Sequence, residues 1–162
     1  MCRWSDAHPN TPAPVRIPCM PASDSTNLLP ARSRSADAGP RFRRLPSGVV
    51  IDAGRGLHWA AVGSGEAASW QDAQRASAAL RLAGHADWRL PSVAELLGLV
   101  DWQRHDPAID TACFDAAPTW YWSATPVAGV PGCAWFVDFA RGVVDFHPIS
   151  SRARWRVVRD AG

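Results

Sequence analysis

The chain has 162 residues, of which 47% are apolar and nine are Trp, enough for one domain with a sizeable core. Its net charge of +2 is uneven: residues 1–45 hold seven Arg against three Asp, a net of +4, and residues 46–162 hold ten Arg against twelve Asp and Glu, a net of −2. No apolar run reaches the roughly 18 residues that a membrane-spanning helix needs, and the weakly acidic main part argues against a nucleic-acid-binding domain.

The first 45 residues are rich in Pro, Ser, Ala and Arg and show little apolar periodicity. Such a composition buries too little apolar surface to offset the entropy lost when the chain is ordered. We therefore predict that residues 1–45 form a disordered extension and that residues 46–162 form the folded domain. Within the extension, Arg41, Arg43 and Arg44 are more typical of a solvated linker than of a contact with an acidic partner.

Two short strands and a helix are predicted next. Residues 48–52 and 57–62 are apolar runs separated and ended by glycines, a pattern typical of a hairpin. From Ser69 the apolar residues recur at helical spacing until Gly84. The sequence therefore predicts a helix with Ser69 as its N-cap and Gly84 at its end.

A second helix is predicted after Pro91. Ser92 and Glu95 have the Ser-x-x-Glu spacing of a capping box, in which each side chain binds the other residue's backbone N–H. Four apolar residues follow and supply a buried face: Leu96, Leu97, Leu99 and Val100.

Beyond a loop at residues 103–118, the apolar period falls to two. Strands are predicted at 121–124, 135–139, 143–146 and 153–157, the middle two joined by a tight turn at 140–142. Strands, two helices and then more strands predict an α+β domain whose first and last strands pair.

Several spaced positions together resemble a known family. The longest pattern is Trp70-x2-Ala73…Gly84-His85-x-Asp87-Trp88-Arg89-Leu90-Pro91-Ser92-x2-Glu95-Leu96-x2-Leu99-Val100. Shorter matches are Gly56-Leu57-x-Trp59, Tyr121-Trp122-Ser123, Trp135-x-Val137-x-Phe139-x2-Gly142 and Arg156-x-Val158-Arg159. Over roughly residues 48–160 the chain resembles the Lcl C-terminal domain family, a bacterial domain of unknown function named after a collagen-like adhesin.

The resemblance carries expectations about fold and setting. The family is distantly similar to C-type-lectin-like and sulfatase-modifying-factor domains, which implies two helices packed on small antiparallel sheets with paired terminal strands. Many relatives carry a Cys in the first helix and another in the last motif, where this chain has Ser77 and Val157. Without that pair, and with no signal peptide in the sequence as it stands, a cytoplasmic setting is expected, whereas the family implies an extracellular or cell-envelope one.

The residues of the family pattern are interpreted as structural. We expect Trp88 to fill the core, Pro91 to set the chain for the second helix, and Arg89 to pair with Glu95 or Asp87, because a guanidinium matches a carboxylate. The same structural role is expected for Trp59, Trp70, Trp122, Ser123, Arg156 and Arg159.

A ligand-binding surface is predicted from the basic and aromatic residues near the C-terminus. Alternate arginines at 152, 154 and 156, together with Arg141 and His147, suggest a basic strip on one sheet face, although such a strip is also typical of simple solvation. Trp120 is a candidate for stacking on a sugar, although aromatic residues at alternate strand positions more often fill a core. The candidate ligand-binding residues are Arg141, His147, Arg152, Arg154 and Trp120.

No residue pattern points to catalysis, a metal or a cofactor. The histidines are scattered, and Asp101, Asp106, Asp110 and Asp115 fit an acidic solvated loop better than a calcium site. Ser123 lacks the glycines of a nucleophile elbow. Cys113 and Cys133 match no motif for sulfatase-modifying activity, and the sequence leaves open whether they pair, a bridge being conceivable only in an exported domain.

These observations favour a binding module over an enzyme. We expect a non-catalytic, adhesion-like domain that recognises a polyanionic glycan or a protein surface. The alternative is an intracellular or phage-associated structural domain that contacts a protein partner without binding glycans.

Overall fold

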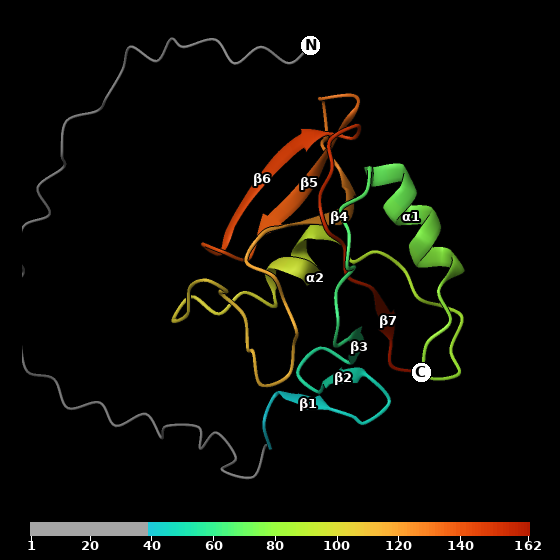
Figure 1. Cartoon of the computed structure of the whole chain (residues 1–162), viewed down its shortest axis with the longest axis vertical. Helices are drawn as coiled ribbons and strands as arrows, with labels where there is room; N and C mark the ends of the chain where they lie inside the picture. The colour runs from blue at the N-terminus through green and yellow to red at the C-terminus, as the bar shows by residue number, and fades with distance from the viewer. Residues whose placement is uncertain (1–38) are drawn as a thin grey trace, which may run out of the picture. The chain divides into compact units, whose positions relative to one another are not determined.

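Residues 39–162 are described by a computed structural model, in which two antiparallel sheets and two helices confirm the predicted α+β class (Figure 1). The predicted disorder of the first 38 residues concerns a segment outside this described part. The elements are β1 (Phe42–Arg44), β2 (Val49–Asp52), β3 (Leu57–Ala60), α1 (Trp70–Ala79), α2 (Val93–Leu97), β4 (Trp120–Pro126), β5 (Cys133–Asp138), β6 (Val143–Pro148) and β7 (Val158–Asp160).

The first sheet has the strand order β1-β2-β3-β7. The predicted hairpin is present as β2 and β3, with Val49 opposite Ala60. The C-terminal strand joins this sheet, as expected, but it pairs with β3 rather than with the first predicted strand, placing Val158 opposite Trp59. It also covers residues 158–160 instead of 153–157, because Ala153 and Arg154 form isolated bridges to other segments.

Strand β1 extends the ordered part beyond the predicted boundary at residue 46. Phe42 packs edge-on against Phe114, with 5.1 Å between ring centroids. Arg41 donates to both carboxylate oxygens of the buried Asp52, at 3.0 and 2.7 Å, and Arg44 donates to Asp115. Arg41 and Arg44 are therefore paired residues rather than a solvated linker, and their partners are too distant in sequence for local composition to reveal.

Both helices begin where the sequence predicted. The Ser69 side chain accepts from the Asp72 backbone N–H at the start of α1, and Ser92 and Glu95 form the predicted capping box of α2. However, α1 ends at Ala79 instead of Gly84. The chain then makes a tight turn between Leu82 and His85, whose backbones exchange hydrogen bonds of 3.2 and 3.0 Å. This turn directs Leu80 and Leu82 against the cluster that contains the buried Trp88.

The second sheet has the order β4-β5-β6, and the predicted β5–β6 hairpin is present, with Trp135 opposite Phe146. In Figure 1, α2 lies between the two sheets and α1 flanks β4. The main core cluster joins the sheets through α2: it includes Trp59, Leu96, Tyr121 and Val137, each at most 1% exposed. The long loop after α2 contributes Ile109 and Phe114 to this core, whereas its first part, residues 102–106, is exposed.

Candidate functional site

The pair Arg89–Glu95 is present and organises the start of α2. Arg89 donates to both carboxylate oxygens of Glu95, at 2.9 and 2.8 Å, and Glu95 also accepts the backbone N–H of Ser92 at 2.7 Å. The Arg89 guanidinium is the main cause that lowers the pKa of Glu95 from 4.5 to about 2. The predicted alternative partner, Asp87, does not bind Arg89, because it binds Arg159 instead.

Arg159 joins β7 to the segment before α2. Its Nε donates to the carboxylate of Asp87 at 2.9 and 3.1 Å, and its Nη1 lies 2.9 Å from Nδ1 of His58 on β3. Since a guanidinium can only donate, Nδ1 of His58 accepts, which requires a neutral imidazole. Burial and the Arg159 charge both lower the pKa of His58.

Arg156 is buried, so it does not belong to the predicted basic strip. It is 1% exposed and donates to the backbone carbonyls of Ala60, Ala61 and Asp115, at 2.5, 2.6 and 2.9 Å. Burial lowers its pKa to about 10. Its role in the structure is to tie the end of β3 to the loop that precedes β4.

Other residues of the family pattern also make buried structural contacts. The indoles of Trp70 and Trp122 donate to the carbonyls of Ser123 and Ala68. The Ser123 hydroxyl is completely buried and donates to the Trp135 carbonyl at 2.7 Å. Its side chain therefore holds β4 and β5 together.

The five predicted ligand-binding residues are distributed over three regions. Trp120 and His147 flank Phe136 on one face of the second sheet, with ring centroids 4.0 and 5.1 Å from the Phe136 ring. Arg152 and Arg154 donate to the carbonyls of Ala67 and Ser64 in the loop before α1. Arg141 lies exposed in the β5–β6 turn.

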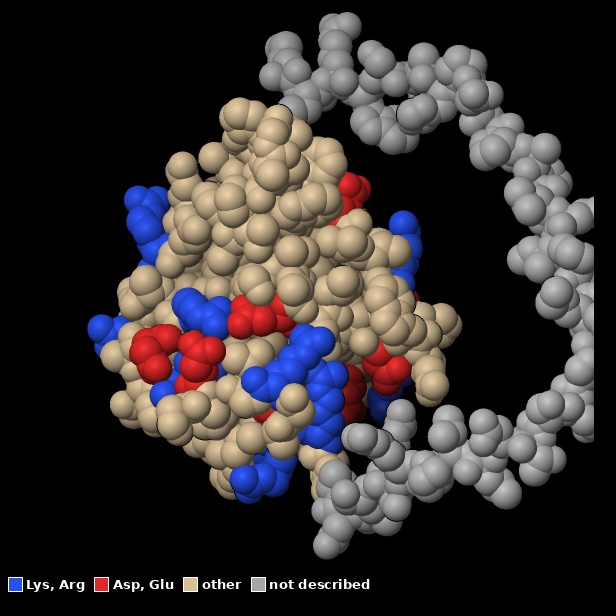
Figure 2. All heavy atoms as spheres, turned by 180° about the vertical axis from the view of Figure 1, so that it is seen from behind, with Lys and Arg blue, Asp and Glu red and all other residues tan. Residues whose placement is uncertain are grey.

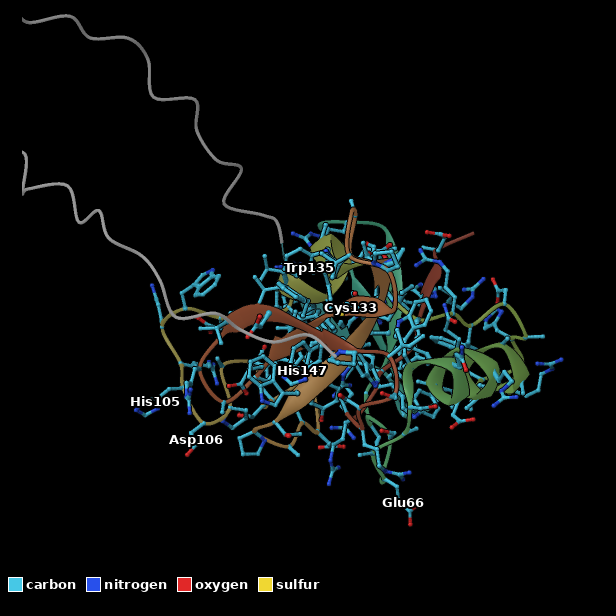
Figure 3. The ribbon with its side chains drawn as sticks, turned by 90° about the horizontal axis from the view of Figure 1, so that it is seen from above. Glu66, His105, Asp106, Cys133, Trp135 and His147 are labelled. Atoms are coloured by element: carbon cyan, nitrogen blue, oxygen red, sulfur yellow. The ribbon has the colours of Figure 1, made fainter. Side chains whose placement is uncertain are left out.

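The acidic loop and the cysteines show no metal-ligand arrangement. Within residues 39–162, no group of three His, Cys, Asp or Glu side chains is placed to hold a metal ion. In Figure 3, His105 and Asp106 lie on an outlying loop, away from Cys133, Trp135 and His147. Cys113 and Cys133 are both buried and are not joined to each other by a disulfide.

Sequence reasoning missed the most exposed aromatic side chain of the described part, that of Trp102, which is 69% exposed. It lies in the loop after α2 and lines three neighbouring hollows, with volumes of about 440, 420 and 420 Å³. Arginines contribute to all three: Arg104 to the first, Arg41 and Arg104 to the second, and Arg55 to the third. We call the surface formed by Trp102, Arg55, Leu97, Val100, Arg104 and Pro107 the Trp102 face.

Gly142, in the β5–β6 turn, packs closely against Val100 and Trp102 of the Trp102 face. A Cβ at Gly142 would lie 2.8 Å from Val100 Cγ1 and 3.4 Å from the Trp102 ring, so only the absence of a side chain permits this approach. Gly142 also has a φ of 71°, which favours glycine. Arg141, one of the predicted ligand-binding residues, directly precedes Gly142 in the chain and is therefore close to this contact.

The charges of the Trp102 face are only partly neutralised. Arg104 pairs with Asp101 at 2.9 Å, and Arg41, which lies beside the face in the lining of the second hollow, pairs with Asp52. Arg55 instead donates to the carbonyls of Ala94 and Glu95. Figure 2 shows the molecule from behind. Acidic and basic side chains are intermixed over its lower half, and this side has no broad patch of one sign.

No helix in residues 39–162 has both the length and the apolar character needed to cross a bilayer. The family model of the Lcl C-terminal domain matches residues 48–159, well over half of the chain. The matched range begins just before β2 and ends inside β7, so it includes α1, α2 and the loop that carries Trp102. A search of curated proteins finds no match.

Proposed function

The chain belongs to the Lcl C-terminal domain family, and we propose that its domain is a non-catalytic, adhesion-like binding module. It recognises a polyanionic glycan or a protein surface through the Trp102 face. The observation that carries this proposal is the exposure of Trp102 among three hollows, each edged by at least one arginine and the second also by Asp101 and Asp110.

An exposed Trp surrounded by hollows is a feature typical of a binding surface. Trp buries a large apolar area, and Trp and Arg are enriched among the few residues that contribute most of the binding energy of an interface. Arginines around such a ring supply planar donors for carboxylate or sulfate groups. The non-catalytic part of the proposal is supported by Ser123, whose hydroxyl is buried and already bonded to a backbone carbonyl.

We also propose that the fold is C-type-lectin-like. The sheet that joins N-terminal β3 to C-terminal β7, the second three-stranded sheet and the long loop between α2 and β4 support this assignment. In such an arrangement the paired ends hold a scaffold, and the long loop is free to carry recognition residues.

The test is binding of the full chain to an array that includes sulfated polymers, neutral sugars and immobilised proteins, at low and at physiological salt. A signal lost in Trp102→Ala and kept in Val62→Ala would support the proposal, because Val62 is also exposed, at 59%, but does not line any of these three hollows. A glycan signal should weaken at the higher salt.

The array also separates the competing surfaces and the alternative function. A glycan signal lost in Arg152→Ala/Arg154→Ala but kept in Trp102→Ala would overturn the Trp102 face as the site. Binding to proteins alone would favour the alternative, an intracellular or phage-associated structural domain that does not bind glycans.

A further inference from the structure

The third hollow of the Trp102 face has an apolar lining with one charged side chain. It is lined by Arg55, Ala94, Leu97, Gly98, Val100 and Trp102. Ala94 and Leu97 belong to α2, and Gly98 caps its end. Apart from the indole N–H of Trp102, the guanidinium of Arg55 is the only side-chain group in this lining that can form a hydrogen bond.

Arg55 is held in place by the end of α2. Its Nη1 is 3.4 Å from the carbonyl oxygens of both Ala94 and Glu95. The guanidinium lies directly over Gly98, where an added Cβ would collide with it. None of the ion pairs found in residues 39–162 involves Arg55, so its charge has no carboxylate partner there.

From this geometry we propose that the hollow binds an apolar carboxylic acid, an inference that rests on the proposed binding function of the Trp102 face. The carboxylate binds Arg55, because a guanidinium offers two parallel donors to a carboxylate. The apolar part packs on Leu97, Val100 and the Trp102 ring. Two sources share this chemistry: the C-terminal residue of a peptide and a free apolar acid.

The lining of this one hollow, taken apart from the two others of the Trp102 face, favours an apolar acid over a sugar. Each hydroxyl of a sugar that enters a site loses water and needs a new partner, and Arg55 alone cannot serve several hydroxyls. An apolar side chain needs none, and the aliphatic floor beside the indole matches it. Because Arg55 is exposed, the ion pair is screened and binding should be weak, on the order of 0.1–1 mM.

The test is an NMR titration of the full chain that follows the backbone amides of Gly98 and Val100. The probes are N-acetylphenylalanine and its amide, then Gly-Gly-Phe with a free and with an amidated C-terminus. Both free acids should bind about two- to fivefold more tightly than their amides, the preference expected for one solvent-exposed ion pair. Equal binding of acids and amides, or no shift with any probe, would overturn the proposal. Tighter binding of the peptide acid than of the single residue would identify a peptide C-terminus as the source.

Two variants separate the role of Arg55 from a change in folding. Arg55→Gln removes the charge and should abolish the preference for the acids. Gly98→Ala keeps the charge but displaces the guanidinium, and its backbone tolerates Ala because the φ of Gly98 is −67°; it should lower the preference as well. Arg43→Gln, on exposed β1 outside this hollow, is the matched control and should leave binding unchanged. An acid preference that survives Arg55→Gln would overturn the assignment.

Failure of this inference differs from failure of the proposed function. If acids and amides do not bind but Trp102→Ala still abolishes an array signal, the carboxylate site is wrong and the binding face stands. If acids bind through Arg55 while Trp102→Ala leaves the array signal unchanged, the hollow is a site for acids and the array ligand binds elsewhere.

Discussion

Glu95 is bound by Arg89 through both carboxylate oxygens, at 2.9 and 2.8 Å, while it also accepts the backbone N–H of Ser92. One side chain thus caps α2 and fixes the chain that precedes it. The helix is only five residues long, yet Leu96, its fourth residue, is completely buried between the sheets. Positioning of α2, and with it the edge of the Trp102 face, therefore depends on this carboxylate.

Glu95→Ala should lower the free energy of unfolding by about 1–3 kcal/mol, through loss of the cap and of the partner of Arg89. Urea denaturation of the variant and the parent protein measures the difference. Asp160→Ala is the control, because Asp160 meets the same arginine at 3.3 Å but is 78% exposed, and it should change stability much less. An unchanged free energy of unfolding in Glu95→Ala would contradict the structural role.

Acid should remove the contribution of Glu95 within a defined pH window. Its pKa is lowered from 4.5 to about 2 in the folded protein, mainly by Arg89. A carboxyl with a lowered pKa stabilises the fold above its unfolded pKa and loses that contribution as the pH falls towards the folded value. Unfolding at pH 6, 4 and 3 should show this loss, and the Glu95→Gln variant should show a smaller slope below pH 4.5. Parallel curves would argue against the pair.

His58 should act in a separate, higher pH window. Its pKa is lowered from 6.5 by burial first and by Arg159 next, so the unfolded state binds the proton more readily than the folded state. Stability from the neutral ring is therefore complete above pH 6.5 and decreases as the pH falls through and below that value. Denaturation at pH 7.5 and 5.5 should show the decrease, and His58→Gln should reduce it. If the protein became more stable as the pH fell from 7.5 to 5.5, and His58→Gln removed this gain, the pKa of His58 would be raised in the folded state and the prediction would be wrong.

A comparison of Ala variants at Gly142 and Gly129 distinguishes the cost of backbone strain from the cost of a steric clash at the Trp102 face. Gly142 and Gly129 have φ values of 71° and 76°, so Ala at either position costs on the order of 1 kcal/mol of backbone strain. An added Cβ meets nothing within 4 Å at Gly129, but it meets Val100 and Trp102 at Gly142. Gly142→Ala should therefore destabilise the protein more than Gly129→Ala, and it should weaken ligand binding. Equal effects of the two variants on the free energy of unfolding would show that the close packing of Gly142 against Val100 and Trp102 does not affect stability.

Local signals in the sequence predicted the elements whose determinants are close together along the chain. The capping box of α2 and the β5–β6 hairpin are examples, since each needs residues only a few positions apart. Strand β1 was missed because Arg41 and Phe42 are ordered by Asp52 and Phe114, far away in sequence. The end of α1 was placed too late because Leu80 and Ala83 continue the helical period, yet Leu80 packs, with Leu82, against a tertiary cluster.

The candidate site was harder to predict than the fold, for the same physical reason. Arg156 follows Arg152 and Arg154 at strand spacing, but only the tertiary structure reveals the three carbonyls that bury it. Trp102 follows the predicted second helix and shows no period, so nothing local distinguished it from the buried tryptophans. The chain also approaches Gly142, forty residues later, where an added Cβ would meet Val100 and the Trp102 ring, and this neighbour is invisible to local sequence patterns.

The central claim is that ligands bind at the Trp102 face, and an NMR titration of the indole N–H resonances tests it most directly. The full chain labelled with ¹⁵N would be titrated with a ligand taken from the array, with Trp102→Ala used to assign its resonance. We predict that the Trp102 resonance shifts with saturation, while those of Trp59 and Trp122, which are completely buried, stay in place. Saturable binding that leaves the Trp102 resonance unchanged would contradict the account.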